Sequence, residues 1–440
     1  MSTFASNSEL KIGSTNHGQG ISQVPKDVLS GRRVGMVVFS SYPADPRPRR
    51  AAEALSQEGM QVEVLCQRDA DAPKHEFVAG VNVTRVPIIH HRGGKLSYAY
   101  EYGAFILLAA TILAWRSLSR RYDLIYVHNM PDILVFCALV PKLFGAKVIL
   151  DQHDPMPELM ETIFGLDDSS RSVRIIRLLE KCSFSFADLV ITVNIACKRL
   201  FAERSCKAEK IGVVMNAPDG RIFSYRAAAA PPRDFVPSKL FVIMYHGSLV
   251  ERNGVGLAVD AMARITKTIP NAELRIYGRK TEYLEAVMRK TSEQGLDSCV
   301  KYLGPRTLEQ LVQEIAGCDI GVIPNQRNPF TDINTPTRIF EFLALGKPVV
   351  APRTRGIEDY FDSQSIIFFE AGDPDDLAAQ LEFCCRNATQ TAAVTRHGQQ
   401  IYLQHNWEKE RQELVNLVSG LFSQAQQRVP VEECLAPNAR

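Results

Sequence analysis

The sequence has no excess of charge of either sign. Lysine and arginine together number 51, and aspartate and glutamate 49, in a chain of 440 residues of which 45% are hydrophobic. This balance excludes the strongly basic face of a nucleic-acid-binding protein, so we expect no nucleic-acid partner. The length exceeds what one hydrophobic core usually serves, which predicts two domains.

Signals for secretion and for structural metal binding are also missing. None of the ten cysteines stands in C-x-x-C spacing, and the one close pair, Cys384–Cys385, is vicinal and therefore a poor disulfide candidate. The first thirty residues are polar, without the apolar stretch of a signal peptide. We therefore expect reduced thiols in a cytoplasmic protein, with disordered polar tails over residues 1–30 and 425–440.

Long hydrophobic runs are scarce, with one exception. Residues 103–115 carry no charge and end on Trp115, and three arginines follow, Arg116, Arg120 and Arg121. These thirteen residues would form about 20 Å of helix, whereas a membrane span needs roughly 20 residues. Two interpretations remain: a buried helix packed on a sheet, or an interfacial helix over 97–121 that places the protein at the inner face of the membrane.

Short runs rich in valine, isoleucine and leucine alternate with helical patterns twice along the chain. The strands predicted in the first half are 33–39, 61–66, 123–127, 146–150 and 188–193, with helices near 49–58, 97–120, 131–144 and 171–186. The strands predicted in the second half are 240–245, 273–277, 319–323, 348–351 and 365–369. Apolar strands that alternate with helices indicate parallel sheets covered on both faces, so the sequence predicts two Rossmann-like domains.

A segment rich in proline and alanine separates the two series. It predicts a linker over 226–238, between an N-terminal domain over 31–225 and a C-terminal domain over 239–404. An amphipathic helix is expected over 405–424.

Two loops of the second domain have the composition of an anion site. Ligands of such sheets bind beyond the carboxyl ends of the strands. After the strand 240–245, Gly247 would let the backbone approach a phosphate, and Arg252 would supply a positive charge. An ordinary strand–helix turn with a surface arginine is the alternative.

The second of these loops leads into a helix. Thr335 is predicted as its N-cap and Pro336 as its first residue, with Asn334 just before and Arg338 just after. Glu341 lies six residues beyond Thr335, about 9 Å along the helix axis. This spacing suits a ligand whose phosphates meet the helix start while its ribose hydroxyls meet the carboxylate.

The second half resembles a known family. The loop Tyr245-His-Gly-Ser-Leu, the segment from Glu341 through Gly346-Lys-Pro-Val-Val-Ala351, and His405-Asn-Trp-Glu-Lys409 are similar to family 4 of the glycosyltransferases, and the order and spacing agree over roughly 33–424. The resemblance implies the GT-B fold, in which two Rossmann-like domains face each other across a cleft and a C-terminal helix crosses back to the first domain. It also implies a retaining enzyme that moves a hexose-type sugar from a nucleotide diphosphate to a glycan or lipid-linked acceptor, in polysaccharide or glycoconjugate biosynthesis.

The match to this family is not complete. Glu341 corresponds to the second acid of the Glu-x7-Glu motif, which holds the ribose, whereas the first acid falls at Ile333, flanked by Asp332 and Asn334. Where the family commonly has Arg and Lys in the donor loop, this chain has Ser248 and Asn253. Arg252 and Arg338 are therefore expected to neutralise the departing diphosphate.

The resemblance places the acceptor in the first domain, where polar residues again follow predicted strands. Arg47 and Arg49 precede a helix and could hold an anion, or could be solvated turn residues. His153 corresponds to the family histidine that faces the transferred sugar. The candidates in the neighbouring loops are His128, Asp132 and Glu158, and Glu158 could instead form a local ion pair.

We expect no metal and no cofactor besides the nucleotide sugar. Asp69-Ala-Asp71 has the form of a metal motif, but no second set of ligands accompanies it. The first strand–helix turn lacks G-x-G-x-x-G, which disfavours a dehydrogenase, and no nucleophile elbow is present. A nucleotide-sugar 2-epimerase of the same fold and a non-catalytic sugar-nucleotide-binding protein remain as alternatives.

Overall fold

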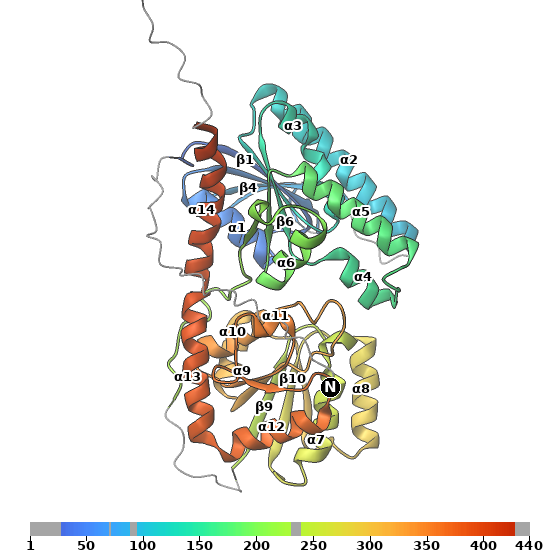
Figure 1. The fold of residues 1–440 in the computed structure, drawn as a ribbon, viewed down its shortest axis with the longest axis vertical. Coiled ribbons are helices and arrows are strands. Elements are labelled where there is room, and N and C mark those ends of the chain that lie inside the picture. The colour runs from blue at the N-terminus through green and yellow to red at the C-terminus, as the bar shows by residue number, and fades with distance from the viewer. Residues whose placement is uncertain (1–27, 70–71, 89–94, 230–238, 427–440) are drawn as a thin grey trace, which may run out of the picture.

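The computed structural model describes residues 28–69, 72–88, 95–229 and 239–426. Most of the two predicted tails, most of the linker 226–238, and Asp71 lie outside these ranges. Within them, two α/β domains follow each other along the long axis of the molecule (Figure 1).

The first domain is built on an eight-stranded sheet. The strands in spatial order are β3 (His75–Val78), β4 (Val81–Val86), β2 (Gln61–Gln67), β1 (Arg33–Ser41), β5 (Leu124–His128), β6 (Lys147–Gln152), β7 (Leu189–Thr192) and β8 (Ile211–Val213). All neighbouring pairs are parallel except β3 with β4. The parallel strands confirm the predicted architecture, whereas the hairpin β3–β4 and the short strand β8 were not predicted.

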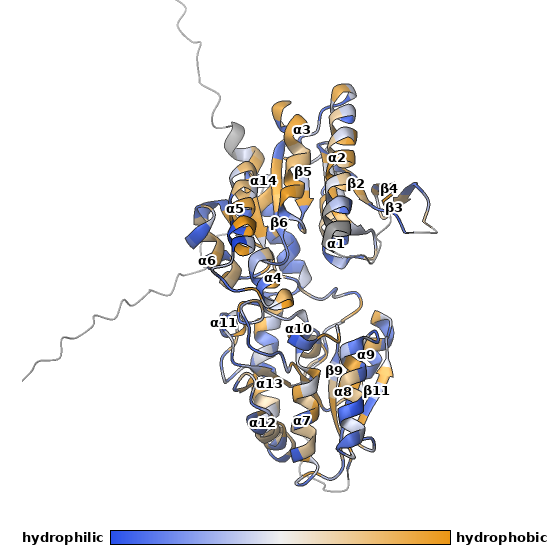
Figure 2. Ribbon diagram, turned by 90° about the vertical axis from the view of Figure 1, so that its right-hand side faces the viewer, coloured by the Kyte–Doolittle hydropathy of each residue, from blue (hydrophilic) through white to orange (hydrophobic). Residues whose placement is uncertain are grey.

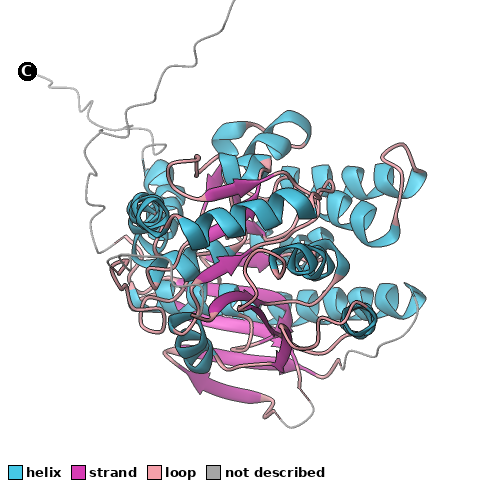
Figure 3. Cartoon of the chain, turned by 90° about the horizontal axis from the view of Figure 1, so that it is seen from below, coloured by secondary structure: helices cyan, strands magenta, loops and turns pink. Residues whose placement is uncertain are grey.

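Helices cover both faces of this sheet, and the view along the molecule shows helices on either side of the strands (Figure 3). The α-helices are α1 (Pro46–Gln57), α2 (Lys95–Ser119), α3 (Leu139–Leu143), α4 (Met156–Phe164), α5 (Arg171–Phe186) and α6 (Ile195–Arg204), and the 3-10 helices are η1 (Asp132–Ala138) and η2 (Ala208–Lys210). Met36 of β1 points to the core under α1, and its neighbour Val37 points to the core under α2. Because both faces are buried, the strand reads as one continuous apolar run.

The second domain is built on a six-stranded sheet in which every pair is parallel. Its strands in spatial order are β11 (Val300–Gly304), β10 (Ala272–Tyr277), β9 (Phe241–His246), β12 (Ile320–Val322), β13 (Val349–Pro352) and β14 (Ile367–Phe369). Its helices are η3 (Glu251–Asn253), α7 (Val255–Ile265), α8 (Glu282–Glu293), α9 (Leu308–Ala316), α10 (Thr337–Ala344), α11 (Arg355–Glu358) and α12 (Pro374–Arg386). Strand β11 was not among the predicted strands.

The last two helices join the domains. Helix α13 (Ala388–Gln404) lies along the second domain, and α14 (Trp407–Gln426) runs along the first (Figure 1). Leu414 and Val418 of α14 are buried in the same apolar cluster as Leu55 of α1 and Val34 of β1. This packing confirms that the C-terminal helix crosses back to the first domain.

Helix α2 is longer than the apolar run in the sequence suggested. Its part from Tyr100 to Ser119 is long and apolar enough to cross a membrane by length and composition, and 22% of its most apolar stretch is buried. One face of α2 packs on the sheet through Phe105, Ala109 and Leu113. The opposite face is apolar as well, so burial against the sheet accounts for only part of its composition.

Candidate functional site

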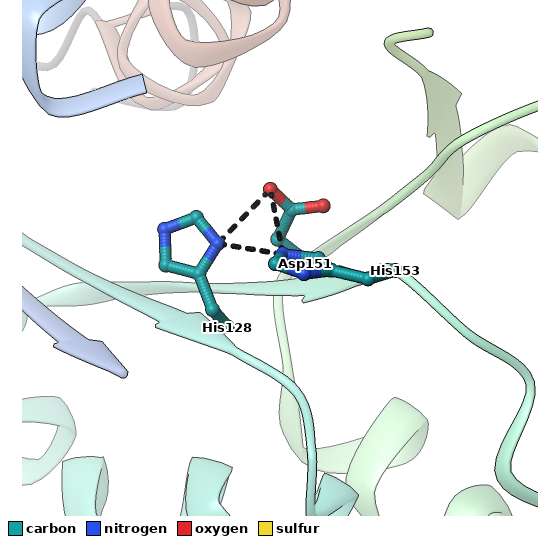
Figure 4. A group of neighbouring side chains, drawn as sticks. All are labelled: His128, Asp151 and His153. Atoms are coloured by element: carbon teal, nitrogen blue, oxygen red, sulfur yellow. Dashed lines mark hydrogen bonds and ion pairs between the residues drawn. The ribbon is translucent and has the colours of Figure 1, made fainter. Parts of the chain in front are cut away.

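Three polar side chains meet where two neighbouring strands of the first sheet end (Figure 4). His128 is the last residue of β5, Asp151 is its partner in the register of β6, and His153 follows β6 directly. The Nδ1 atom of His128 lies 2.9 Å from Nε2 of His153 and 3.3 Å from Oδ2 of Asp151. Strand register therefore brings together the two histidines that the sequence singled out.

Asp151 is held on its other side by a buried arginine. The guanidinium of Arg47 donates to Oδ1 of Asp151 from Nη2 at 2.6 Å and from Nε at 3.0 Å. The hydroxyl of Tyr126 donates to Oδ2 at 2.9 Å. Burial would raise the pKa of Asp151, but Arg47 and the two imidazoles hold that pKa well below its usual range.

Arg47 therefore does not reach out as a free cation. Its guanidinium also donates to the backbone carbonyl of Val214 at 2.9 Å, so its charge is largely compensated by partners within the first domain. Arg49 pairs with Glu53 of the same helix at 2.7 Å. Both arginines lie in the first turn of α1 and not in a loop before it, and neither projects an uncompensated charge.

The other two predicted acceptor-side acids are buried among polar partners. Asp132 accepts from the side-chain amides of Asn129, at 3.2 Å, and Gln152, at 3.0 Å. Burial raises the pKa of Asp132 to about 7. Glu158 forms an ion pair with Arg204, which also binds Glu180, so the local pair that was its alternative interpretation is present in the structure.

On the second domain, the predicted donor residues converge at the end of β9. His246 ends the strand, and Gly247 follows with a φ of +124°, a conformation that favours glycine. Arg338, the second residue of α10, donates to the backbone carbonyl of His246 at 2.9 Å and to Oδ1 of Asn325 at 3.1 Å. Its guanidinium also stacks on the ring of Tyr245, 4.8 Å from the centroid.

Glu341 lies beside His246, with Oε2 of the acid 3.4 Å from Nε2 of the imidazole. Burial raises the pKa of Glu341 to about 7, against the opposing effect of Arg338 and Arg50. Burial and then the charge of Arg338 lower the pKa of His246 to about 3. The imidazole is therefore neutral, and this contact is not an ion pair at neutral pH.

Ser248 and Asn253 occupy the two positions of the donor loop where the family commonly has Arg and Lys. Ser248 and Asn253 bind each other, because the side-chain amide of Asn253 donates to the carbonyl of Ser248 at 2.8 Å. Arg252 is half-buried in η3, and its charge acts on Asp154, which follows His153 in the first domain. Arg252 thus lies near the interface between the two domains.

The loop before α10 corrects one prediction. Helix α10 begins at Thr337, with Pro336 in the cap position and no side-chain cap, so Thr335 is not its N-cap. The hydroxyl of Thr335 donates instead to the carbonyl of Gly356 at 2.6 Å, because the loop folds back on α11. Asn334 precedes it and is half-buried.

The position of the missing family acid is an apolar contact between domains. Ile333 is buried in the same cluster as Val193, Ala196 and Cys197 of the first domain. The side-chain amide of Asn194 also donates to the carbonyl of Ile333 at 2.8 Å. The carboxylate of Asp332 pairs with Arg355 at 2.6 Å, so it does not replace the missing acid as a free ligand group.

Sequence reasoning missed Arg50 and Asp151. Arg50 is the arginine of α1 whose charge acts on Glu341 of the other domain, and it borders a pocket of about 520 Å³. A helical period would have found it, since residues three apart share a face and Arg47 and Arg50 are so spaced. Asp151 is the first residue after the predicted strand 146–150, so the rule that polar residues at strand ends gather at one edge of the sheet could have found it.

The group His128, Asp151 and His153 also has the composition of a metal site, and in the described part of the chain it is the group that could hold an ion. Each residue offers one ligand atom, and these atoms all lie within 4.8 Å of one another. However, Arg47 already contacts both carboxylate oxygens of Asp151 and compensates their charge. A divalent cation placed here would meet the guanidinium at close range.

Comparison with known proteins agrees with this geometry. Residues 44–217 match the model of the glycosyl transferase 4-like domain, and residues 241–387 match that of the glycosyl transferases group 1. Together the two matches span well over half of the chain. The chain belongs to family 4 of the glycosyltransferases.

This glycosyltransferase has relatives among proteins of known function. It is 23% identical over 390 residues to D-inositol 3-phosphate glycosyltransferase of Corynebacterium urealyticum, covering 85% of this chain and 89% of the relative. It is 27% identical to the protein of the same name from Corynebacterium kroppenstedtii over 59% of this chain and 58% of that protein.

Solved structures confirm the GT-B fold. Sucrose-phosphate synthase from Thermosynechococcus elongatus superposes with a TM-score of 0.73 at 16% identity, over 89% of this chain and 100% of that chain. Anabaena HepE, solved in complex with UDP-glucose, superposes with a TM-score of 0.64 at 18% identity, over 88% of this chain and 99% of that chain.

Proposed function

We propose that this glycosyltransferase transfers a hexose, with retention of configuration and without a metal ion, from a nucleotide diphosphate to a glycan or lipid-linked acceptor. The observation that carries the proposal is the set of groups at the end of β9. A neutral His246 and a carboxylate at Glu341 lie beside Arg338, whose guanidinium is fixed by two acceptors. Hydroxyl groups and a diphosphate are the ligand groups that such a set can bind.

The chemistry assigned to each group follows from its charge. Arg338 and Arg252 stabilise the negative charge that develops on the departing diphosphate, which is the largest electrostatic demand of the step. Glu341 accepts hydrogen bonds from ribose hydroxyls. His153, with 17% of its side chain exposed at the end of β6, orients the transferred sugar or the incoming hydroxyl.

The donor can be identified by screening. UDP-glucose is the first candidate, since HepE binds it in a structure of the same fold. Purified protein would be tested by thermal shift against a panel of uridine and guanosine diphosphate hexoses, and then for release of free nucleotide in the presence of EDTA. Product with the opposite anomeric configuration from the donor, seen by proton NMR, would refute retention.

A membrane-bound acceptor is supported by an apolar surface on the first domain, seen as hydrophobic residues along α2 and α3 (Figure 2). Trp115 is 76% exposed, and Leu107 and Leu118 lie on the same side of α2. Exposed apolar side chains continue onto the neighbouring helices, as Leu139, Leu143, Ile175 and Leu178. Contiguous exposed apolar surface of this kind marks an interaction site.

The cations around this surface favour lipid headgroups. Arg120 and Arg121 are exposed at the end of α2, whereas Arg116 is half-buried and bound to Glu63 at 3.2 Å, so it does not belong to the expected set of three. An exposed cation near an anionic surface contributes about 1 kcal/mol. We propose that this surface holds the enzyme at the inner face of the membrane.

Flotation with liposomes that contain phosphatidylglycerol tests this surface. The double variant Trp115→Ser and Leu118→Ser should no longer float with the liposomes. The double variant Arg120→Gln and Arg121→Gln should float only at low salt. Leu308→Ser, on the exposed start of α9 in the other domain, is the matched control and should float as the wild type does. Wild-type protein that stays unbound at low salt would end the membrane proposal.

A further inference from the structure

The histidine pair shares a single hydrogen-bonding position. Nδ1 of His128 faces both Nε2 of His153, at 2.9 Å, and Oδ2 of Asp151, at 3.3 Å. The side chain of His128 is fully buried, and its Nε2 has no hydrogen-bond partner among the described residues. Every polar contact of this imidazole therefore passes through Nδ1.

The charge of Asp151 decides which atom carries the proton. Because Asp151 is ionised beside Arg47 and receives the hydroxyl of Tyr126, its Oδ2 can act only as an acceptor. A proton on Nδ1 of His128 meets this carboxylate, whereas a proton on Nε2 would be buried without an acceptor and would turn a lone pair toward the carboxylate. Leaving a buried donor unsatisfied costs about 1–3 kcal/mol.

The proton on Nδ1 of His128 also determines the tautomer of His153. If Nδ1 of His128 carries hydrogen, then Nε2 of His153 must accept at 2.9 Å, since two N–H groups cannot face each other at that distance. The neutral ring of His153 then carries its own proton on Nδ1. That nitrogen is the one left to meet a ligand, because Nε2 is engaged inside the domain.

We propose that Asp151 is a positioning residue which, through His128, holds His153 as the Nδ1–H tautomer and so makes His153 a hydrogen-bond donor to a sugar oxygen. The structural part of this proposal stands on the contacts alone, whereas its catalytic part rests on the proposed function. Arg47 and Tyr126 keep Asp151 ionised and oriented. The pair acts as a fixed donor and transfers no proton to solvent.

Nitrogen-15 NMR of the histidine side chains tests the tautomers without any substrate. His128→Gln and His153→Gln assign the two signals. We expect both rings of the wild type as neutral Nδ1–H tautomers at neutral pH. An Nε2–H tautomer at His128, or a doubly protonated pair, would overturn the proposal, and this result does not depend on knowing the donor sugar.

Kinetics test the positioning role. Asp151→Asn should lower kcat by about 10- to 100-fold while the dissociation constant of free UDP, whose proposed site lies on the other domain, stays within about twofold. Asp123→Asn, at the opposite end of the same sheet, where Asp123 binds Arg32, is the matched control and should leave kcat unchanged.

Two further experiments cover a variant that does not fold and a bound metal ion. If that variant does not fold, His128→Gln leaves the Arg47–Asp151 ion pair intact and should show the same loss of kcat. If zinc binds the wild type with one equivalent and Asp151→Ala abolishes this binding, the group is a metal site and the proposal is wrong. An unchanged kcat in folded Asp151→Asn would also refute it.

Discussion

Burial of Glu341 at the proposed donor site lowers the folding stability of the protein above about pH 4.5. Glu341 keeps 16% of its side chain exposed, and burial raises its pKa from the ordinary 4.5 to about 7. Between these two values the folded protein binds a proton that the unfolded chain releases. Unfolding is therefore increasingly favoured as the pH rises from about 4.5 to about 7.

Replacing Glu341 by glutamine removes this penalty. A pKa rise from 4.5 to about 7 corresponds to about 3 kcal/mol, fully present above about pH 7 and absent below about pH 4.5. Glu341→Gln without ligand should therefore be more stable than the wild type at about pH 8, by up to this amount, and nearly equal to it at about pH 5. The same substitution should weaken nucleoside binding, because a charged acceptor of ribose hydrogen bonds is lost, at about 1.5–3 kcal/mol.

Denaturation in guanidinium at the two pH values measures the stability difference, and calorimetry measures the affinity for the nucleoside of the donor. The nucleoside avoids titration of a phosphate. Glu293→Gln, an exposed acid at the end of α8 in the same domain, is the control and should show no such pH dependence. A Glu341→Gln protein that is less stable than the wild type at both pH values, or that binds the nucleoside unchanged, would refute the reasoning.

Other consequences of the site can be measured directly. Arg338→Ala should reduce affinity for the nucleoside diphosphate far more than for the nucleoside, as seen by calorimetry, and equal losses would remove Arg338 from the phosphate site. Activity should survive EDTA, and complete inhibition that Mn²⁺ or Mg²⁺ reverses would show that a metal is needed. Wild-type affinity for the nucleoside should fall as the pH drops below about 7 and Glu341 takes up its proton, and it should level off near the affinity of Glu341→Gln. Ile333→Glu should lower the melting temperature strongly, because an acid would be buried between the domains without a partner, whereas Ile333→Val should cost about 0.5–1.5 kcal/mol.

The sequence by itself determined the architecture of this glycosyltransferase. Continuous apolar strands that alternate with helices identify parallel sheets, because only a sheet buried on both faces needs apolar residues at every position. Residues at the ends of such strands must gather at one edge of the sheet, which is why His128, His153 and Gly247 could be named in advance. Glu341 was named from its spacing along a helix and from the family motif instead. The hairpin β3–β4 and strands β8 and β11 were not predicted. β3 is exposed and β11 half-exposed, polar residues interrupt β4, and β8 has only three residues, so none of them has a strong apolar pattern.

The tertiary structure alone decided what these residues do to one another. Only strand register shows that Asp151 faces His128, and Arg47 was taken for an acceptor-side cation although it is buried on that acid. Ile333 could be recognised as a missing acid, but only the packing of the two domains shows that it fills an apolar contact. The hydrophobic pattern of a segment indicates which face of a sheet or helix is buried. Contacts between segments distant in the sequence depend on how the sheets and helices pack.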